Sequence, residues 1–254
     1  MTDSFAIRVT HIRQRFKVVH ERPDTLREAF AKRFRNARNF QDFDALKGVS
    51  FEVPKGEMLG VIGRNGSGKS TLLKVIAGVY KPTEGRVEVN GKIAALIELG
   101  AGFHPELTGR ENIILNGLIL GYSRKEMAAR AERIIEFAEL GDFIDSPVKQ
   151  YSSGMYGRLA FAVATEVDPD ILLLDEVLAT GDAGFTRKSL ERMEGFHKSE
   201  KTIVLVSHDL ASISRYCERA LLIHQGRLLE DGTPDDVIEK YKELIGLSLE
   251  TPAV

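Results

Sequence analysis

The sequence predicts an α/β fold with a mostly parallel core sheet, and three apolar runs carry this prediction. Residues 171–174 and 203–206 are wholly apolar and are separated by a segment of helical character. Strands of a parallel sheet are covered by helices on both faces, so they read as continuous apolar runs. The run Met58–Ile62 leads through a glycine-rich turn into an apolar helix expected at 70–79. Strand, glycine loop and helix, in that order, are what a phosphate site requires.

A smaller antiparallel β subdomain is expected near the N-terminus. Its first strands are predicted at residues 5–10 and 45–53. A turn at 81–85 precedes a strand at 86–90, and the pair Asn90-Gly91 then predicts a hairpin with a strand at 92–98.

The apolar pattern becomes helical from about residue 100 to residue 165. Ser123 and Glu126 form a capping box that opens one helix, and Gly141 is expected to end it. A closing helix at about 233–247 begins with Thr233 as N-cap and Pro234 at the first helical position. We therefore expect one domain over residues 1–254, with a helical subdomain at about 100–165.

The composition is that of an ordinary soluble globular protein. Of the 254 residues, 43% are hydrophobic and 28% are charged, which excludes collagen-like, disulfide-scaffold and disordered classes. No apolar run approaches the roughly 18 residues that cross a bilayer, and the first residues contain no signal-peptide segment. The single cysteine, Cys217, cannot form an internal disulfide, in agreement with a reducing cytoplasm. The net charge of −2 gives no bulk attraction to DNA or lipid.

One motif indicates a triphosphate site. The backbone N–H groups of a glycine loop, with the positive end of the following helix, surround phosphate where side chains would obstruct it. Lys69 is expected to reach the β and γ phosphates, and the Ser70 hydroxyl to hold Mg²⁺. The alternative is a chance glycine-rich turn, which would rarely have a strand before it and a helix after it. The pattern G-x-x-x-x-G-K-[ST] is matched by Gly63, Arg64, Asn65, Gly66, Ser67, Gly68, Lys69 and Ser70.

Three further polar residues follow predicted strands. Asp175 and Glu176 come directly after the run 171–174, at the strand end where parallel sheets place ligands. Asp175 suits a water-mediated Mg²⁺ partner, and Glu176 suits the polarisation of an attacking water. His208 follows the run 203–206, whose strand is expected beside that of Asp175, so its imidazole can reach the γ phosphate. The alternative is that the acidic pair has no role in a site and that the histidine at the strand end is structural.

A serine and glycine pair precedes the apolar helical run at 159–167. In one interpretation Ser152 and Gly154 are only a helix cap. In the other they form a second phosphate-binding helix terminus. Because the first loop already surrounds the phosphates from one side, this terminus would act most easily on nucleotide held by another subunit.

These motifs, in this order, resemble the ATP-binding cassette (ABC) family over almost the whole chain. Residues 63–70 are similar to its Walker A loop, 152–155 to its signature, 171–176 to its Walker B strand, and 179–182 to its D-loop. The resemblance implies a P-loop NTPase fold of ABC type, with Lys69, Glu176 and His208 as catalytic groups. It also implies ATP and Mg²⁺ as cofactors, and a head-to-tail dimer of the chain with a second copy of itself. Each ATP would contact residues 64–70 and Thr71 of one copy and Ser152 and Gly154 of the other, while Phe16, unless it is a core residue, would stack on adenine.

Departures from the family pattern indicate a subfamily. The usual signature is Leu-Ser-Gly-Gly-Gln, whereas Tyr151, Ser153 and Met155 stand here. The loop that usually supplies a glutamine to the metal has none between residues 81 and 110, and its nearest candidate is Glu98. With the stretch 98–111, these features resemble the exporters of lipid-linked polysaccharides. The resemblance implies a peripheral motor at the cytoplasmic face of the membrane, paired with an integral membrane permease, in indirect contact with the glycan and bound to no nucleic acid.

An insertion at about 22–43 supports this subfamily independently. Leu26, Phe30 and Phe34 follow one another at helical spacing and give an apolar stripe. A basic amphipathic helix suits the anionic cytoplasmic leaflet, a phosphate-bearing lipid carrier or the membrane partner. The alternative is a helix packed on its own domain with a solvated basic face. The basic flank consists of Arg27, Lys32, Arg33, Arg35 and Arg38.

The sequence therefore predicts an ATP-hydrolysing motor subunit that exports a lipid-linked polysaccharide, O-antigen-like first and teichoic acid or capsule second. A soluble ABC ATPase acting on nucleic acid or ribosomes is the main alternative, but such proteins usually carry paired cassettes or long coiled coils, and no sustained heptad is present. A binding module without catalysis is disfavoured because Lys69, Asp175, Glu176 and His208 are all in place.

Overall fold

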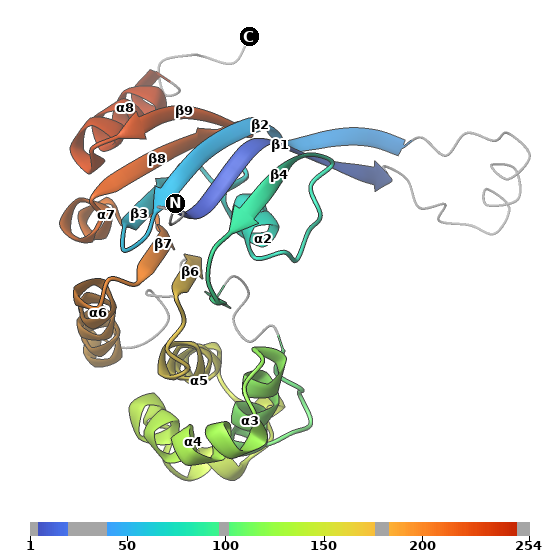
Figure 1. Ribbon diagram of the computed structural model, residues 1–254, viewed down its shortest axis with the longest axis vertical. Helices are drawn as coiled ribbons and strands as arrows, with labels where there is room; N and C mark the ends of the chain where they lie inside the picture. Colours follow the sequence, from blue (N-terminus) through green and yellow to red (C-terminus); the bar gives the residue numbers. More distant parts are fainter. Residues whose placement is uncertain (1–4, 20–39, 97–101, 176–182, 248–254) are drawn as a thin grey trace, which may run out of the picture.

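The computed structural model describes residues 5–19, 40–96, 102–175 and 183–247, which Figure 1 shows as coloured ribbons. In chain order the elements are β1 (Phe5–Val19), β2 (Phe40–Pro54), β3 (Met58–Ile62), α2 (Lys69–Ile76), β4 (Glu84–Val89), β5 (Ile93–Leu96), α3 (Gly109–Ile119), α4 (Arg124–Ala138), the 3₁₀ helices η1 (Gly141–Asp145) and η2 (Val148–Gln150), α5 (Ser153–Glu166), β6 (Ile171–Asp175), α6 (Ala183–Lys198), β7 (Thr202–Val206), α7 (Leu210–Tyr216), β8 (Arg219–His224), β9 (Arg227–Gly232) and α8 (Pro234–Leu247).

The strands form two sheets, which confirms the predicted α/β class. The larger sheet has the order β5-β6-β7-β3-β8-β9, and its strands are parallel except for the antiparallel pair β8 and β9. The smaller sheet has the order β2-β1-β4 and is antiparallel throughout. Helices α3, α4 and α5 form a lower lobe set apart from the smaller sheet (Figure 1).

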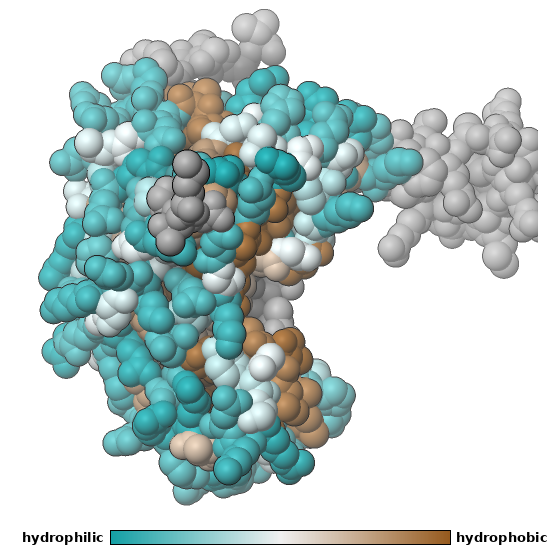
Figure 2. All heavy atoms as spheres, viewed as in Figure 1, coloured by the Kyte–Doolittle hydropathy of each residue, from teal (hydrophilic) through white to brown (hydrophobic). Residues whose placement is uncertain are grey.

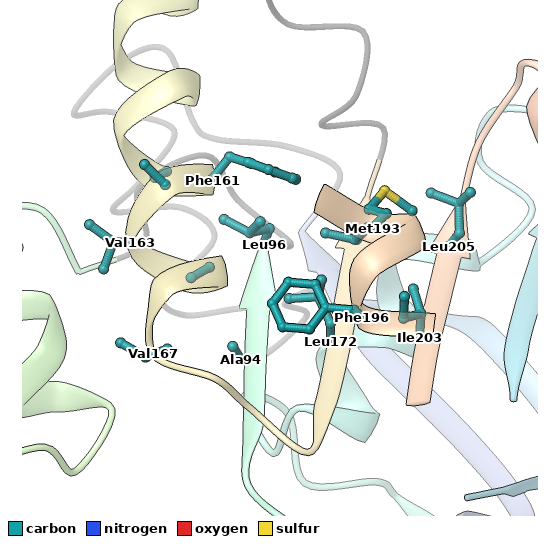
Figure 3. Packing of buried hydrophobic residues seen from close by; sticks show 14 of the residues in the cluster. Ala94, Leu96, Phe161, Val163, Val167, Leu172, Met193, Phe196, Ile203 and Leu205 are labelled. Carbon is teal, nitrogen blue, oxygen red and sulfur yellow. The ribbon is translucent and has the colours of Figure 1, made fainter. Parts of the chain in front are cut away.

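Both faces of the larger sheet are buried, which explains why its central strands read as uninterrupted apolar runs. Because successive side chains of a strand point to opposite faces, Leu172 and Leu205 pack in a cluster with α5 and α6, whereas Leu173 and Val204 pack in a second cluster with α2 and the smaller sheet. Figure 3 shows the first cluster, with Leu172, Ile203 and Leu205 lying against Met193 and Phe196 of α6. The parallel pairing of β6 and β7 is the predicted one.

Strands β1 and β2 are longer than predicted, at 15 residues each. Their outer ends carry charged residues, and a cross-strand ion pair joins the Arg15 guanidinium to the Asp44 carboxylate over 2.8 Å. Apolar patterning does not detect a ribbon that is held by cross-strand charge pairs. Residues 40–43 therefore belong to β2 and not to the predicted insertion helix, and residues 20–39 lie outside the described residues.

The predicted hairpin at Asn90-Gly91 is wrong. Strand β4 pairs with β1 in the smaller sheet, whereas β5 pairs in parallel with β6 in the larger one. Gly91 has φ 145° and lies close to Asp170, whose carboxylate accepts a hydrogen bond of 2.8 Å from the Lys92 amide. The chain passes from the smaller sheet to the larger one at this turn. The Asn90-Gly91 pair thus correctly predicted a turn, but the predicted strand partner was wrong.

Helix ends in the lower lobe follow local capping rules. The predicted box of Ser123 and Glu126 opens α4, and an unforeseen box of Thr108 and Glu111 opens α3. Helix α4 ends earlier than predicted, because Glu139 adopts the left-handed conformation at φ 52° before Gly141 is reached. Helix α8 begins at Pro234 as predicted. Among the described helices, none has the length and apolarity of a membrane span.

Helix α6 is joined to the lower lobe by charge and by aromatic contacts. The Glu166 side chain at the end of α5 is 12% exposed and pairs with Arg133 of α4 over 2.8 Å and with Arg192 of α6 over 2.5 Å. Phe185 of α6 packs edge-on against Phe137 of α4 and Phe161 of α5, with ring centroids 5.8 Å and 6.1 Å apart. Helix α6 is thereby joined to α5, the helix that Ser152 caps.

We expect Glu166→Gln to lower the free energy of unfolding by about 1–3 kcal/mol, because two guanidinium groups lose their anionic partner. Urea denaturation measures the change. Glu136→Gln is the matched control, since Glu136 is exposed on the neighbouring α4. If the two substitutions lowered the free energy of unfolding equally, the claim that Glu166 joins α6 to the lower lobe would be contradicted.

Candidate nucleotide site

The loop between β3 and α2 approaches two neighbouring strands so closely that glycine is required. Gly68 has φ 111°, and a Cβ atom there would lie 2.7 Å from the carbonyl oxygen of Ala45 in β2. A Cβ atom on Gly63 would collide with the carbonyl oxygen of Ile223 in β8. Gly68 is also the N-cap of α2 and provides no side-chain hydrogen bond, so it leaves the first N–H groups of that helix facing the loop. Such a terminus attracts anions.

Backbone hydrogen bonds fix this loop to the turn between β8 and β9. The Ser67 amide donates to the Arg64 carbonyl over 3.1 Å, which closes the loop on itself. The Gly226 amide donates to the Ser67 carbonyl over 2.8 Å, and the Lys47 amide of β2 donates to the Gly226 carbonyl over 2.7 Å. The loop is therefore held in place by strands from both sheets.

A pocket of about 480 Å³ opens beside the loop. The Lys69 side chain is 6% exposed, and its Nζ donates to the Gly63 carbonyl over 2.7 Å and to the Arg64 carbonyl over 3.2 Å. This cation is the deepest charged group of the phosphate loop. The pocket brings together predicted residues from the loop, the start of α2 and the end of β6, and adds two residues of β2; its lining consists of Phe43, Ala45, Asn65, Gly66, Gly68, Lys69, Ser70, Thr71 and Asp175.

Ser70 and Asp175 contribute a hydroxyl and a carboxylate to this one pocket. Such hard oxygen donors are the type that Mg²⁺ prefers. The described residues contain no group of three or more acidic, histidine or cysteine side chains placed to hold a metal. This pair therefore fits Mg²⁺ as it is commonly bound, by one or two protein oxygens with phosphate and water completing the shell.

His208 lies at the same edge of the larger sheet as Asp175. Asp175 pairs with Val206 across β6 and β7, and His208 follows two residues later with its side chain exposed. The next residue, Asp209, caps α7, and hydrogen bonding from Ser212 lowers the pKa of its carboxyl group, with a smaller contribution from His208. The His208 side chain is exposed and does not belong to the pocket lining.

Ser152 and Gly154 lie at the start of α5, and α5 belongs to the lower lobe, away from α2 (Figure 1). Ser152 is the N-cap of α5, and its exposed side chain accepts a hydrogen bond of 3.2 Å from the Met155 amide. Within a single chain, Ser152 therefore acts as a helix cap, which is the first of the two interpretations. Neither residue lines the pocket of its own chain.

Residues 46–179, more than half of the chain, match the family model described as ABC transporter. The chain belongs to the ABC transporter family. A dimeric ATP-binding cassette, solved in a post-hydrolysis state with ADP and Pi, superimposes with a TM-score of 0.73 at 25% identity over 90% of this chain and 98% of that one. The predicted ABC-type fold is confirmed.

Curated relatives of this ABC protein include ATP-binding proteins of export systems. The O-antigen export system ATP-binding protein RfbB of Myxococcus xanthus is 55% identical over 214 residues, which cover 84% of this chain and 49% of that protein. RfbB of Klebsiella pneumoniae is 46% identical over 93% of this chain and 97% of its own length. The teichoic acids export ATP-binding protein TagH of Bacillus cereus is 40% identical over 95% of this chain and 43% of its own length. The chain thus spans about half of some relatives and nearly all of another.

One aromatic residue that lines the pocket of this ABC protein was not predicted from the sequence. Phe43 lines the pocket, whereas the predicted Phe16 is half-buried and packs edge-on against Tyr80, with ring centroids 5.4 Å apart. Phe43 was missed because it was assigned to the insertion. Its alternation with Ala45 on one face of a strand was the signal that could have found it. Glu98, Glu176 and the segment 179–182 lie outside the described residues.

We expect Gly68→Ala to weaken MgATP binding by this ABC protein at least about ten-fold, since a Cβ atom 2.7 Å from the Ala45 carbonyl displaces the loop and ten-fold corresponds to only about 1.4 kcal/mol. Titration calorimetry measures the affinity. Gly78→Ala is the control, because Gly78 also has positive φ, at 75°, but a Cβ atom there meets nothing within 4 Å. Equal affinities for Gly68→Ala and the unmodified chain would show that the close approach is unimportant.

Proposed function

We propose that this chain is the ATP-hydrolysing motor subunit of an ABC exporter of lipid-linked polysaccharide. The observation that carries the enzymatic part is the single pocket that unites the glycine loop, Lys69, Ser70 and Asp175. The polysaccharide class rests on relatives whose names specify O-antigen export and teichoic acids export. Those names favour export over an action on nucleic acid or ribosomes.

The residues of the pocket have separate roles in phosphoryl transfer. The loop N–H groups and the N-terminus of α2 bind the phosphates, and the Lys69 ammonium moves from the Gly63 and Arg64 carbonyls to phosphate oxygens. Ser70 and Asp175 would hold Mg²⁺, which neutralises phosphate charge when bound. Glu176 accepts a proton from the attacking water, and His208 contacts the γ phosphate at the open end. Positioning and charge neutralisation supply most of the acceleration in such reactions.

The second half of each site comes from a second copy of the chain in this proposal. Ser152 is the N-cap of α5, its side chain is exposed, and it stands outside the pocket of its own chain. Its helix has 14 residues, so its N-terminus carries a full positive dipole end. A head-to-tail pair would place this terminus against the nucleotide bound by the partner's glycine loop. The dimeric state of a similar cassette supports the arrangement.

The lower lobe offers a surface for the membrane permease. Figure 2 shows apolar side chains gathered on one edge of that lobe. Helix α3 carries two large hydrophobic residues in solvent, Leu118 at 47% and Ile119 at 61% exposure. Adjacent exposed apolar residues of this size are typical of interaction sites. The chain in this proposal is peripheral, at the cytoplasmic face of the membrane, with the basic segment at 22–39 as a further candidate contact to lipid or permease.

We expect Glu176→Gln to keep MgATP affinity within about three-fold but to lower ATP turnover at least about 100-fold, because a general base contributes that much. The blocked protein should accumulate as a nucleotide-bound dimer, which size-exclusion chromatography in MgATP detects. Lys69→Ala is the reference for lost binding and should remain monomeric. Full turnover by Glu176→Gln would refute the assignment of Glu176 as base.

A further inference from the structure

The first turn of α5 is exposed, although the middle of the helix is buried. The side chains of Ser152 and Ser153 are exposed, whereas the residues from Leu159 to Thr165 lie in the core. Among the described residues, a Cβ atom on Gly154 would approach no element other than its own helix and cap. Helix ends fray where few contacts hold them. Contacts beside this turn therefore decide how firmly it is held.

Tyr151 makes such a contact directly before the cap. Its hydroxyl donates a hydrogen bond of 2.7 Å to the Phe143 carbonyl in η1. The same hydroxyl lies so close to α3 that a Cβ atom on Gly109 would collide with it. Burial raises the pKa of the Tyr151 hydroxyl, and hydrogen bonding from the Gly109 backbone lowers it by a smaller amount, so the group keeps its proton and remains a donor near neutral pH. One phenol group thus joins the residue before Ser152 to both η1 and α3.

The backbone before Tyr151 is held by pairing with the segment that leads into α3. The Val148 amide donates to the Leu107 carbonyl over 3.0 Å, and the Lys149 amide donates to the Pro105 carbonyl over 3.1 Å. These bonds fix the chain as far as Lys149. The orientation of the cap that follows depends on the Tyr151 side chain.

We propose that Tyr151 is a positioning residue for the second half of the nucleotide site, an inference that rests on the proposed function. Its hydroxyl fixes the Ser152 cap, and with it the N–H groups of the first turn, in the orientation that a nucleotide on the second copy requires. Hydrogen bonds to phosphate are directional, so a terminus that is already oriented loses less conformational entropy when two copies associate. Tyr151 does not line the pocket of its own chain, so its hydroxyl acts on the association of two copies and not on nucleotide binding by one.

Tyr151→Phe removes the hydroxyl and keeps the ring. The test uses the Glu176→Gln chain as parent, since that chain is expected to accumulate as a nucleotide-bound dimer. We expect Tyr151→Phe to raise the dissociation constant of the dimer in MgATP about ten-fold, because each dimer contains two such caps. Analytical ultracentrifugation over a range of protein concentrations measures this constant. The affinity for MgATP at dilutions where the protein is monomeric should stay within about two-fold of the parent's.

Tyr122→Phe is the matched control. The Tyr122 hydroxyl also donates to a backbone carbonyl, that of Val167 over 2.5 Å, at the opposite end of α5. This control should lower the free energy of unfolding as much as Tyr151→Phe does and leave the dissociation constant of the dimer unchanged. In a Ser152→Ala background, Tyr151→Phe should raise that constant less than about three-fold, because a positioning residue acts through the group that it positions.

Equal dissociation constants for Tyr151→Phe and its parent would overturn the proposal. So would an equal rise in Tyr122→Phe, which would reduce the effect to one of stability, or a ten-fold rise that persists undiminished in the Ser152→Ala background. If the parent forms no dimer in MgATP, the proposed pairing of two copies fails and this proposal fails with it. If the parent forms the dimer and Tyr151→Phe forms it equally well, only this proposal fails and the proposed function stands.

Discussion

The backbone of the glycine loop touches carbonyl groups of two strands that belong to different sheets. Gly68 lies against Ala45 of β2 in the smaller sheet, and Gly63 lies against Ile223 of β8 in the larger one. No side chain separates these segments. A change in the distance between the two sheets would therefore change the shape of the loop. The orientation of the α2 N-terminus, the depth of Lys69 and the entry of β2 into the pocket all depend on this contact.

The parallel strands of the larger sheet position the remaining residues of the site. Its central strands are buried on both sides and end at the same edge, so Asp175 and the segment leading to His208 are placed together by register alone. The lower lobe is linked to this edge through α6, whose Arg192 shares the Glu166 carboxylate with Arg133. A shift of α5, which Ser152 caps, would therefore be transmitted to α6.

Much of this arrangement was predictable because it depends on local chemistry. The buried strands appear as apolar runs, Ser123 and Pro234 mark helix starts, and the glycine loop has a fixed spacing. The failures share a different cause. The predictions of a hairpin at Asn90-Gly91 and of short strands β1 and β2 were wrong. Strand partners and cross-strand ion pairs depend on residues that are distant in the sequence, and a local sequence pattern does not include them. Phe43 was missed for a different reason: it was assigned to the insertion, although its alternation with Ala45 is a local strand pattern.

Titration of the purified chain with MgATP tests the central claim, that a loop locked between two sheets forms a working triphosphate site. The account predicts saturable binding of one MgATP per chain, with affinity lost when Lys69→Ala removes the only ammonium group among the residues that line the pocket. Absence of measurable MgATP affinity in folded, unmodified protein would contradict it.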